Sequence, residues 1–435
     1  MSDFATFKER RIKLMNILGD GVLVMASARH QVRNHDVDFP FRQDSDFFYL
    51  TGFNEPDSVL ILKKNASSVR SILLVPPKDK VKEIWEGKRA GVQGAIEHFG
   101  FDEAHSNEKL EEVLEEELED ENVLFYEFNR DLSLDDTILS SLDSFTKRGR
   151  TNPLFPQTIR FYGRDLGEMR HIKKPEEILL MRKAVEITRE ANHKVMQELK
   201  PGMNEGEVQA LLEFEYRRNG GESGYGNIVA CGENATILHY TNNDCQMKSD
   251  ELLLIDSGCE YKFYTADVTR CYPVGGKFTP NQKKVYEIVL EANKKAIEKA
   301  VVGSDLKQVH KAALEVLAAG LVELGVAKGS LQEQMESGDL GKYYMHNTSH
   351  WLGMDVHDVG LYDIAGEPVS FERGMAFTIE PGLYFNPDFS GETTPYDGIG
   401  VRIEDNIVID LDGPIVLTKD IPKEVDEIEK IMAER

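Results

Sequence analysis

An internal repeat in the second half of the chain restricts the folds that this sequence can adopt. The 21 residues from Arg189, REANHKVMQELKPGMNEGEVQ, align with those from Leu290, LEANKKAIEKAVVGSDLKQVH, at an offset of 101 residues and share six identities. Two similar amphipathic helices could reach this identity by chance, so the segments after the two copies provide a second comparison. Further along the chain after each copy, a predicted apolar strand ends in a carboxylate. One further residue and then a glycine follow that carboxylate. The sequence therefore predicts a domain built from two matched halves.

Each half offers two acidic residues from neighbouring predicted strands. Asp256 closes the apolar run of LLLIDSG and Asp267 lies in FYTADVTRCYPV, whereas Glu380 closes the run of FTIEPG and Glu404 lies in VRIEDNIVI. An ionised carboxylate in a buried strand is unfavourable unless a cation or a hydrogen-bond donor faces it. A single such acid is adequately explained as a turn cap or as the partner of a nearby arginine. Four acids in two matched pairs instead favour a site for two divalent cations.

Two such cations are expected to lie ~3.5–4 Å apart and to lower the pKa of a shared water toward ~7. Carboxylate ligands suit Mn²⁺, Mg²⁺ or Ca²⁺, and one added imidazole shifts the preference toward Mn²⁺, Co²⁺ or Zn²⁺. The segment HNTSHWLGMDVHDVG contains His346, His350 and His357 at spacings of four and seven residues, which on a helix would form one stripe. Several residues between them disfavour a helix, so this stripe is not expected to form one metal site: Asn347, Thr348, Ser349 and Gly353.

The length of 435 residues predicts two domains. In the first part, apolar runs such as GVLVMAS, VLILKK and SILLVP alternate with helical patterns, which is typical of an α/β domain with a partly parallel sheet. Residues 147–170 are predicted to be loop-like, and a long helix is predicted to begin near Pro175. We therefore place a boundary near residue 170, with domains at 1–170 and 171–435, and assign the chain to the α/β (α+β) class.

Charge and composition exclude several classes of function. A net charge of −25 and a pI near 4.9 argue against nucleic-acid and anionic-membrane partners. The sequence contains no apolar stretch of the ~20 residues that a membrane span requires, and its first twenty residues contain no signal-peptide core. The four cysteines form no CxxC pair, so neither a zinc knuckle nor a disulfide framework is expected. A cytoplasmic protein with reduced thiols is the simplest interpretation.

Together, LLIDSGCEYKFYTADVTRCYPV, HNTSHWLGMDVHDVG, FTIEPGLY and GIGVRIEDN closely resemble the aminopeptidase P family of pita-bread dinuclear metallopeptidases. The N-terminal segment FPFRQDSDFFYLTGFNEPDSVLIL resembles the N-terminal domain of the same family. The resemblance spans roughly residues 35–410 and includes all five metal-ligand motifs in order. It implies a creatinase-like mixed α/β domain, involved in oligomerisation and substrate restriction, followed by a pseudo-twofold pita-bread catalytic domain.

The resemblance also implies a set of metal ligands and a reaction. Asp256 would bind one metal ion, Asp267 and Glu404 would bridge both ions, and His350 and Glu380 would complete the other. The cofactors would be two divalent ions, with Mn²⁺ expected first and Co²⁺ or Zn²⁺ as alternatives. The family removes an N-terminal residue that is followed by proline, by attack of a metal-bridging hydroxide on the Xaa-Pro bond. Glu380 would shuttle the proton.

Further residues match family positions around the substrate. His239 would lie beside the substrate, and His357 would stabilise the tetrahedral intermediate, a contribution of ~3 kcal/mol in analogous sites. Another group matches the proline-side pocket or the residues that support it: His346, Tyr384 and Arg402. Trp85, in EIWEGKRAG, resembles a tryptophan that reaches a neighbouring subunit's active site, which implies a homodimer or homotetramer.

The sequence departs from the family pattern in three places. Asn347 and Thr348 stand where Gly, or Gly-Leu, is expected, beside the proline-side pocket. Gly226 stands where related sequences often have a bulkier residue. Cys231 and Cys271 are not expected to be cysteines, and we interpret them as buried structural thiols.

The same motifs leave alternative functions open. Prolidase uses the same metal site but cleaves only Xaa-Pro dipeptides, and the sequence separates it from aminopeptidase P weakly. Creatinase-like relatives and non-catalytic pita-bread binding proteins lack metal ligands, whereas this chain has all five. Methionine aminopeptidase resembles the second half alone. The expected function is therefore a metal-dependent Xaa-Pro aminopeptidase that acts on peptides, with prolidase as the alternative and a binding-only role as a remote one.

Overall fold

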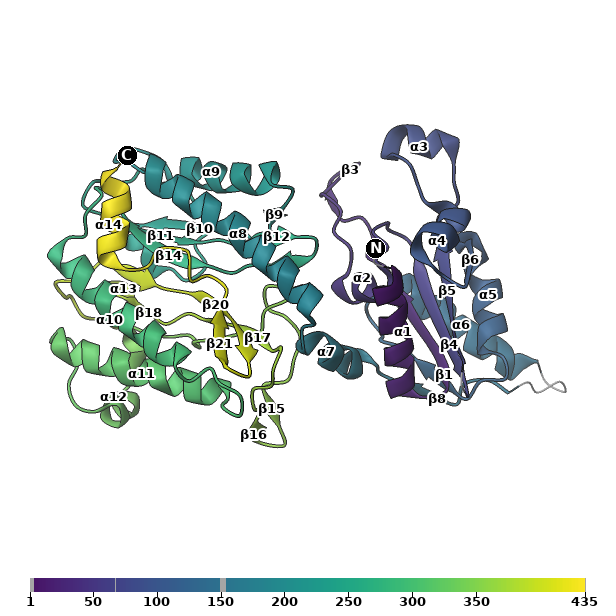
Figure 1. Cartoon of the computed structure of the whole chain (residues 1–435). Coiled ribbons are helices and arrows are strands. Elements are labelled where there is room, and N and C mark those ends of the chain that lie inside the picture. Colours follow the sequence, from purple (N-terminus) through teal and green to yellow (C-terminus); the bar gives the residue numbers. More distant parts are fainter. Residues whose placement is uncertain (1–3, 67, 149–153, 435) are drawn as a thin grey trace. The chain divides into compact units, whose positions relative to one another are not determined.

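The structure, a computed structural model, describes residues 4–66, 68–148 and 154–434 (Figure 1). Internal contacts divide the chain into two compact units, Met1–Met169 and Arg170–Arg435. Both units mix helices and strands, as expected for the α/β (α+β) class. Among the described residues, no helix is both long and apolar enough to cross a membrane.

The N-terminal unit contains a six-stranded mixed sheet in the order β6-β5-β4-β1-β7-β8. β1 pairs antiparallel with β4 and parallel with β7, so the predicted partly parallel sheet is confirmed. Its strands are β1 (Gly21–Ala26), β4 (Val59–Asn65), β5 (Ser68–Val75), β6 (Glu103–Ser106), β7 (Val123–Phe125) and β8 (Thr158–Arg160), and β2 (Val32–Asn34) and β3 (Val37–Asp38) form a separate hairpin.

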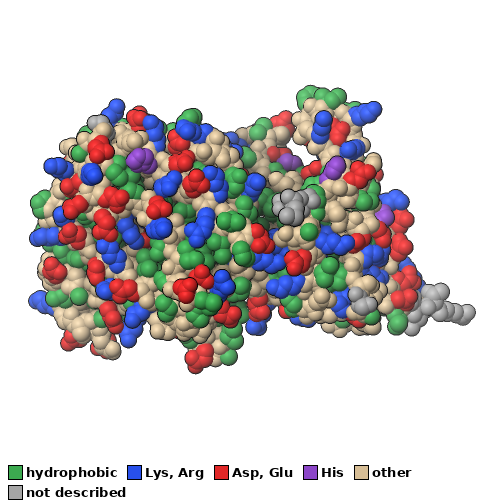
Figure 2. Space-filling view, viewed as in Figure 1, with side chains coloured by type: hydrophobic (Ala, Val, Ile, Leu, Met, Phe, Trp, Pro, Cys, Tyr) green, Lys and Arg blue, Asp and Glu red, His purple; other side chains and the backbone are tan. Residues whose placement is uncertain are grey.

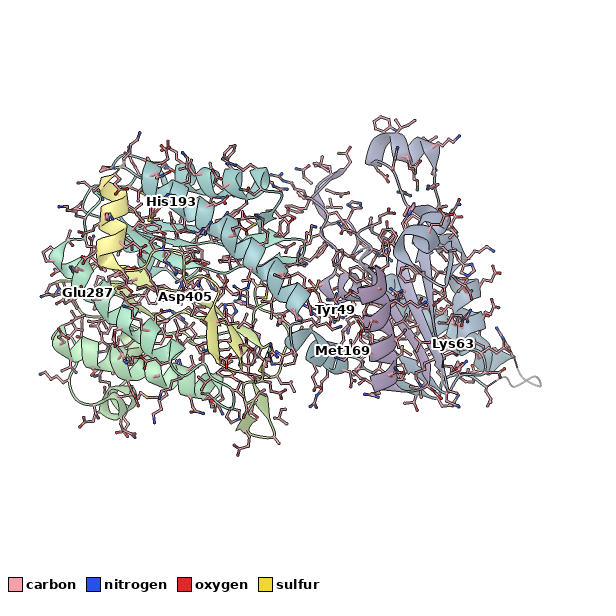
Figure 3. All side chains as sticks on the ribbon, viewed as in Figure 1. Tyr49, Lys63, Met169, His193, Glu287 and Asp405 are labelled. Atoms are coloured by element: carbon pink, nitrogen blue, oxygen red, sulfur yellow. The ribbon has the colours of Figure 1, made fainter. Side chains whose placement is uncertain are left out.

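The helices of this unit are α1 (Phe4–Leu18), α2 (Ser45–Thr51), α3 (Lys80–Glu86), α4 (Gly91–Phe99), α5 (Leu110–Leu118) and α6 (Leu132–Lys147), and α7 (Gly163–His171) includes the last residues of the unit. Alternate strand residues such as Val22, Val24 and Ile61 share a buried core with apolar residues of α5 and α6. On α2, the Tyr49 hydroxyl donates to the backbone carbonyl of Met169 at 3.2 Å (Figure 3). The loop predicted over 147–170 is wrong in part, because β8 and α7 form there; residues 149–153 of that stretch lie outside the described residues.

The C-terminal unit consists of two halves with matching order. Two antiparallel sheets, β10-β11-β14 and β17-β20-β21, are accompanied by the helix pairs α8–α9 and α10–α11. Figure 1 shows α8 and α9 on one side of the strands and α10 and α11 on the other. The first half contains α8 (Pro175–Glu198), α9 (Glu205–Arg218), β10 (Ile228–Cys231), β11 (Leu252–Asp256) and β14 (Thr269–Pro273), and the second contains α10 (Pro280–Ile297), α11 (Leu306–Glu323), β17 (Ala376–Ile379), β20 (Asp405–Asp410) and β21 (Gly413–Val416).

The sequence repeat has a structural cause in the turns between the paired helices. Gly202 and Gly303, which are identical in the alignment, have φ angles of +89° and +82°, in the region that favours glycine. The next helix begins at the same offset in both copies, because Asn204 caps α9 and Asp305 caps α11 through their side chains. The predicted pair of matched halves, and with it the pita-bread fold class, is confirmed.

Surface charge and cysteine chemistry agree with the composition. On the face drawn in Figure 2, acidic and basic side chains are interspersed. All four cysteines are free, with Cys231, Cys259 and Cys271 buried and Cys245 exposed. Burial raises the pKa of the Cys271 thiol to about 12, so this thiol stays protonated at neutral pH.

Candidate metal centre

The acidic residues of the two halves meet at interruptions between paired strands. In the second half, β17 pairs with β20 and β18 (Gly382–Tyr384) pairs with β19 (Gly400–Arg402). Glu380 lies between β17 and β18, and Glu404 lies between β19 and β20, so the two carboxylates come from opposite strands at the same break. In the first half, Asp256 ends β11, and Asp267 lies between β13 (Tyr264–Thr265) and β14.

The two glycines that come after the strand-ending carboxylates allow this close approach. A Cβ atom on Gly258 would lie 1.7 Å from the carbonyl oxygen of Ala266, next to Asp267. A Cβ atom on Gly382 would lie 2.9 Å from the carbonyl oxygen of Val401. The carboxylate-X-Gly pattern of each half is therefore a packing requirement: only glycine lets the returning strand approach the acid.

Hydrogen bonds between the halves hold Asp267 and Glu404 beside each other. The Asn406 side chain accepts from the backbone N–H of Asp267 at 3.1 Å and donates to the Asp267 carbonyl. The Thr269 hydroxyl donates to Glu404 Oε2 at 2.7 Å, and the Glu404 backbone N–H donates to the Thr269 carbonyl at 3.1 Å. These contacts fix the positions of two buried carboxylates whose charges repel each other.

His350 completes the cluster from an extended segment that runs beside β17. The Thr378 N–H donates to the His350 carbonyl at 2.9 Å, and the Glu380 N–H donates to the Thr348 carbonyl at 2.8 Å. The segment is not helical, so the three histidines do not form a stripe, as expected from the sequence. His350 Nδ1 lies 3.1 Å from the Trp351 carbonyl, so Nδ1 keeps its proton when the ring becomes neutral, and Nε2 is then free to bind a cation.

His350 Nε2 faces three carboxylates. It lies 3.2 Å from Asp267 Oδ2, 3.6 Å from Glu380 Oε1 and 3.9 Å from Glu404 Oε1. Asp256 is paired with the guanidinium of Arg402 at 2.7 Å. Asp267, His350 and Glu404 can bring one donor atom each within 4.8 Å of one another.

The protonation behaviour of the cluster reflects a surplus of buried negative charge. Burial, together with the charges of Asp267 and Glu380, raises the pKa of Glu404 well above its usual range. Burial also raises the pKa of Glu380, to about 7. Burial lowers the pKa of His350, but the hydrogen bond and charge of Asp267 outweigh it and raise that pKa to about 9. Without bound cations, the buried carboxyl groups and His350 therefore retain protons, which offset the negative charge of the cluster.

The donor set fits divalent cations. Four carboxylates converge on a buried volume in which Asp267 is 5% and Glu404 is 1% exposed, and cations would replace the protons that the carboxylates otherwise retain. Oxygen ligands with one imidazole suit Mn²⁺, Co²⁺ or Zn²⁺. The five residues that the sequence predicts as ligands are thus brought together by the structure: Asp256, Asp267, His350, Glu380 and Glu404.

Tyr225 belongs to the cluster although the sequence does not predict it there. Its hydroxyl lies 2.7 Å from Asp256 Oδ1 and 2.5 Å from Asp267 Oδ1, so it holds the two acids of the first half together. Burial and the charges of both acids raise its pKa well above the usual value, which keeps it a donor. A tyrosine 31 residues before Asp256 carries no signal of this contact; the one local hint is the adjoining Gly226, which departs from the family pattern.

The acidic cluster lies in the wall of a cleft of about 490 Å³. His239 and His357 line the same cleft, and the rings of His350 and His357 are 4.4 Å apart in an edge-on arrangement. Burial lowers the pKa of His357, so its ring is neutral at neutral pH and has one N–H to donate.

The predicted proline-side residues form one hydrogen-bonded chain. His346 Nε2 lies 2.8 Å from the Tyr384 hydroxyl, and the Arg402 guanidinium donates to the same hydroxyl at 3.0 Å. Burial lowers the pKa of His346 to about 3, so this histidine is neutral. Trp85 lies in the other unit, on α3, where its side chain is 85% exposed.

Comparisons with known proteins agree with this geometry. Residues 179–410 match the model of metallopeptidase family M24, and residues 7–126 match that of the aminopeptidase P N-terminal domain. The Xaa-Pro aminopeptidase of Escherichia coli is 39% identical over 429 residues, which cover 98% of this chain and 97% of the relative. Human Xaa-Pro aminopeptidase 3 is 33% identical over 441 residues, which cover 98% and 85%.

Solved structures are similar over the whole chain. The Pseudomonas aeruginosa aminopeptidase PepP superposes with a TM-score of 0.96 at 38% identity, covering 99% of this chain and 98% of the other. The zinc-substituted E. coli aminopeptidase P in complex with product gives the same values. A two-half fold with a carboxylate-rich centre, matched over this length, defines a metallopeptidase.

The chain belongs to metallopeptidase family M24, in the branch that carries the aminopeptidase P N-terminal domain.

Proposed function

We propose that this protein is a metal-dependent Xaa-Pro aminopeptidase, which releases the N-terminal residue from peptides with proline in the second position. One observation carries the proposal: five residues suited to binding two divalent cations lie together in the wall of a substrate-sized cleft. The near-full-length similarity to Xaa-Pro aminopeptidases supports the choice of reaction.

The residues of the cluster, Asp256, Asp267, His350, Glu380 and Glu404, would hold two cations. Bound there, the cations would supply Lewis-acid chemistry and lower the pKa of a water toward ~7. Glu380 faces His350 at the open side of the cluster, with its side chain 16% exposed, and would carry a proton from the attacking water to the departing proline nitrogen.

Histidines on the cleft wall would contact the substrate and stabilise the negative charge that develops on its carbonyl oxygen. His357, as a neutral donor beside His350, would stabilise the oxygen of the tetrahedral intermediate. His239 would contact the substrate from another segment of the lining. Arg402 has a positioning role, because it binds both Asp256 and the Tyr384 hydroxyl and so links the acidic cluster to the proline side.

The test uses protein loaded with Mn²⁺ and three peptides. Hydrolysis of Ala-Pro-Ala to alanine and Pro-Ala is expected, with little turnover of Ala-Ala-Ala. Rapid cleavage of the dipeptide Ala-Pro with no turnover of the tripeptide would instead identify a prolidase. Treatment with EDTA is expected to abolish activity, and Mn²⁺, Co²⁺ or Zn²⁺ added back separately would rank the metals.

Assembly and location complete the proposal. We infer a homodimer or homotetramer, because the exposed face of α3 presents Val81, Ile84 and Trp85, which are 67%, 80% and 85% exposed. Light scattering of the native protein tests this, and a monomer would contradict it. A cytoplasmic location fits the free cysteines, and fractionation of the source cell tests it.

A further inference from the structure

Asn347 offers the substrate cleft a hydrogen-bonding side chain at a position where the family pattern expects glycine. It is exposed and lines the cleft together with His346 and His350. Within the described ranges, its side-chain amide makes no hydrogen bond to the protein; its backbone carbonyl is the part that is used, by His346. The amide is therefore available to a ligand, with both a donor and an acceptor.

His346 has no ring nitrogen available for a hydrogen bond to a ligand. Its Nδ1 lies 2.7 Å from the Asn347 carbonyl, and since a carbonyl only accepts, Nδ1 carries the proton. Its Nε2 then accepts from the Tyr384 hydroxyl at 2.8 Å, which leaves neither ring nitrogen for the substrate. On this wall His346 presents a ring face, and Asn347 presents the polar group.

Thr348 anchors the segment that carries Asn347. The Thr348 side chain is fully buried, and its hydroxyl lies 2.7 Å from His310 Nδ1 and 2.8 Å from the Tyr344 hydroxyl. Its carbonyl accepts from the Glu380 N–H, so the segment is extended beside β17. Thr348 is thereby held inward, whereas the preceding residue, Asn347, is exposed and lines the cleft.

The chemistry of the substrate shows what Asn347 can bind. In a peptide with proline second, the proline nitrogen is the leaving group and has no N–H to donate. The nearest peptide group beyond it is the one that joins proline to the third residue. Its N–H exists in tripeptides and longer chains and is absent from a Xaa-Pro dipeptide.

We propose that Asn347 is a specificity-determining residue, whose side-chain oxygen accepts the N–H of the third substrate residue and so favours longer peptides. This inference rests on the proposed function and on the predicted place of His346, the neighbour of Asn347 in the cleft lining, on the proline side. The two residues that differ from the family pattern then have complementary roles: Thr348 anchors the segment, and Asn347 contacts the peptide.

The experiment compares two substrates, Ala-Pro-Ala and Ala-Pro-pyrrolidide, in Mn²⁺-loaded protein. The pyrrolidide keeps the carbonyl after proline but lacks the N–H. Asn347→Ala is expected to lower kcat/KM for the tripeptide about threefold to tenfold, the range of one neutral hydrogen bond, mainly through KM. For the pyrrolidide, the variant should stay within about twofold of wild type. Asn281→Ala, on α10 outside the cleft lining, serves as the control and should change neither.

Equilibrium binding provides a readout without turnover. Calorimetric titration of the product Pro-Ala should show the same threefold to tenfold weakening in Asn347→Ala. Equal losses for both substrates, or no loss for the tripeptide, would overturn the assignment. If wild-type protein cleaves neither substrate, the proposed function fails instead, and the variant is not needed to show it.

Discussion

Glu404 and Asp405 are consecutive buried carboxylates, yet their surroundings give them opposite properties. Asp405, labelled in Figure 3 within the C-terminal unit, is fully buried and accepts from the Arg270 guanidinium at 2.8 Å and the Thr418 hydroxyl at 2.6 Å, with Lys423 as a second cation. Burial would raise the pKa of Asp405, but Arg270 and Lys423 outweigh it and hold that pKa well below its usual range. In the adjacent residue, Glu404, the pKa of the carboxyl group is instead raised well above its usual range.

The difference shows which carboxylates belong to the fold and which to the site. Asp405 has its counter-charges built into the protein, so its ionisation stabilises the native structure. Glu404 faces Asp267, Glu380 and Asp256, and its hydrogen bond from Thr269 does not neutralise them. Both carboxylates are buried, but only Asp405 has protein cations that balance its charge. A buried carboxylate without such cations is what a metal site requires, because the positive charge then comes from a bound metal ion.

The largest expected effect is on activity. Glu404→Ala or Asp267→Ala should lower kcat/KM by at least about a thousandfold, roughly 4 kcal/mol, because each removes a buried carboxylate of the proposed metal centre. Steady-state hydrolysis of Ala-Pro-Ala measures this. Asp410→Ala removes a carboxylate at the far end of β20, the strand that begins directly after Glu404, and should keep near wild-type activity; an equal loss there would mean that β20 tolerates no substitution.

The next largest effect is on stability, at the neighbouring residue. Asp405→Ala should lower the free energy of unfolding by about 3–5 kcal/mol, because Arg270 is left buried without its partner. Urea unfolding of metal-free protein measures this. In the same assay, Glu404→Ala should cost less than Asp405→Ala, since Glu404 has no buried cation that its removal would leave unpaired. If both variants lose the same stability, the distinction between the two carboxylates is wrong.

A third effect separates binding of the transition state from binding of the metal. His357→Ala should lower kcat by about 10²–10³-fold and leave KM and metal content nearly unchanged, because His357 lines the cleft without facing the carboxylates as His350 does. Metal analysis of the purified variant is the control. Loss of metal from His357→Ala would move this residue into the ligand set.

The smallest effect is the pH dependence of the metal-free protein. Burial raises the pKa of Glu380 to about 7, and the carboxylates raise that of His350 to about 9. The folded state therefore binds both protons more tightly than the unfolded state does, so their stabilisation is present at low pH and is lost as pH rises through these values. Tm should fall by a few degrees between pH 7 and 9, because the histidines whose pKa burial lowers, such as His346, are already mostly neutral in both states above about pH 6.5. Saturation with Mn²⁺ should remove this fall, and a Tm that rises over this range without metal would contradict the assignment.

Much of the site could be predicted because several of its residues occur in recognisable short sequence patterns. Asp256 and Glu380 each close an apolar strand, and the repeat pairs them, so the four acids can be grouped from the sequence alone. Gly202 and Gly303 appear in the alignment as identities and in the structure as left-handed turns. Such features are visible in sequence because one backbone conformation permits few residue types.

The remainder depends on contacts between distant segments. Tyr225 and Asn406 reach Asp267 from 42 and 139 residues away, and neither residue type signals such a contact. Helix α7, GRDLGEMRH, has two glycines and mostly polar residues, so it lacks the apolar spacing that predicts a helix. The sequence therefore predicts a loop where the structure has this helix.

The central claim is that Asp256, Asp267, His350, Glu380 and Glu404 bind two divalent cations, and titration of metal-free protein with Mn²⁺ tests it most directly. Calorimetry, with metal analysis of the dialysed product, should show two equivalents per chain in wild type and a loss of binding in Glu404→Ala, while Asp410→Ala still binds two. Peptide cleavage should appear as the sites fill. Wild-type protein that binds no Mn²⁺, Co²⁺ or Zn²⁺ at this cluster, or a Glu404→Ala variant that still binds two ions, would contradict the account.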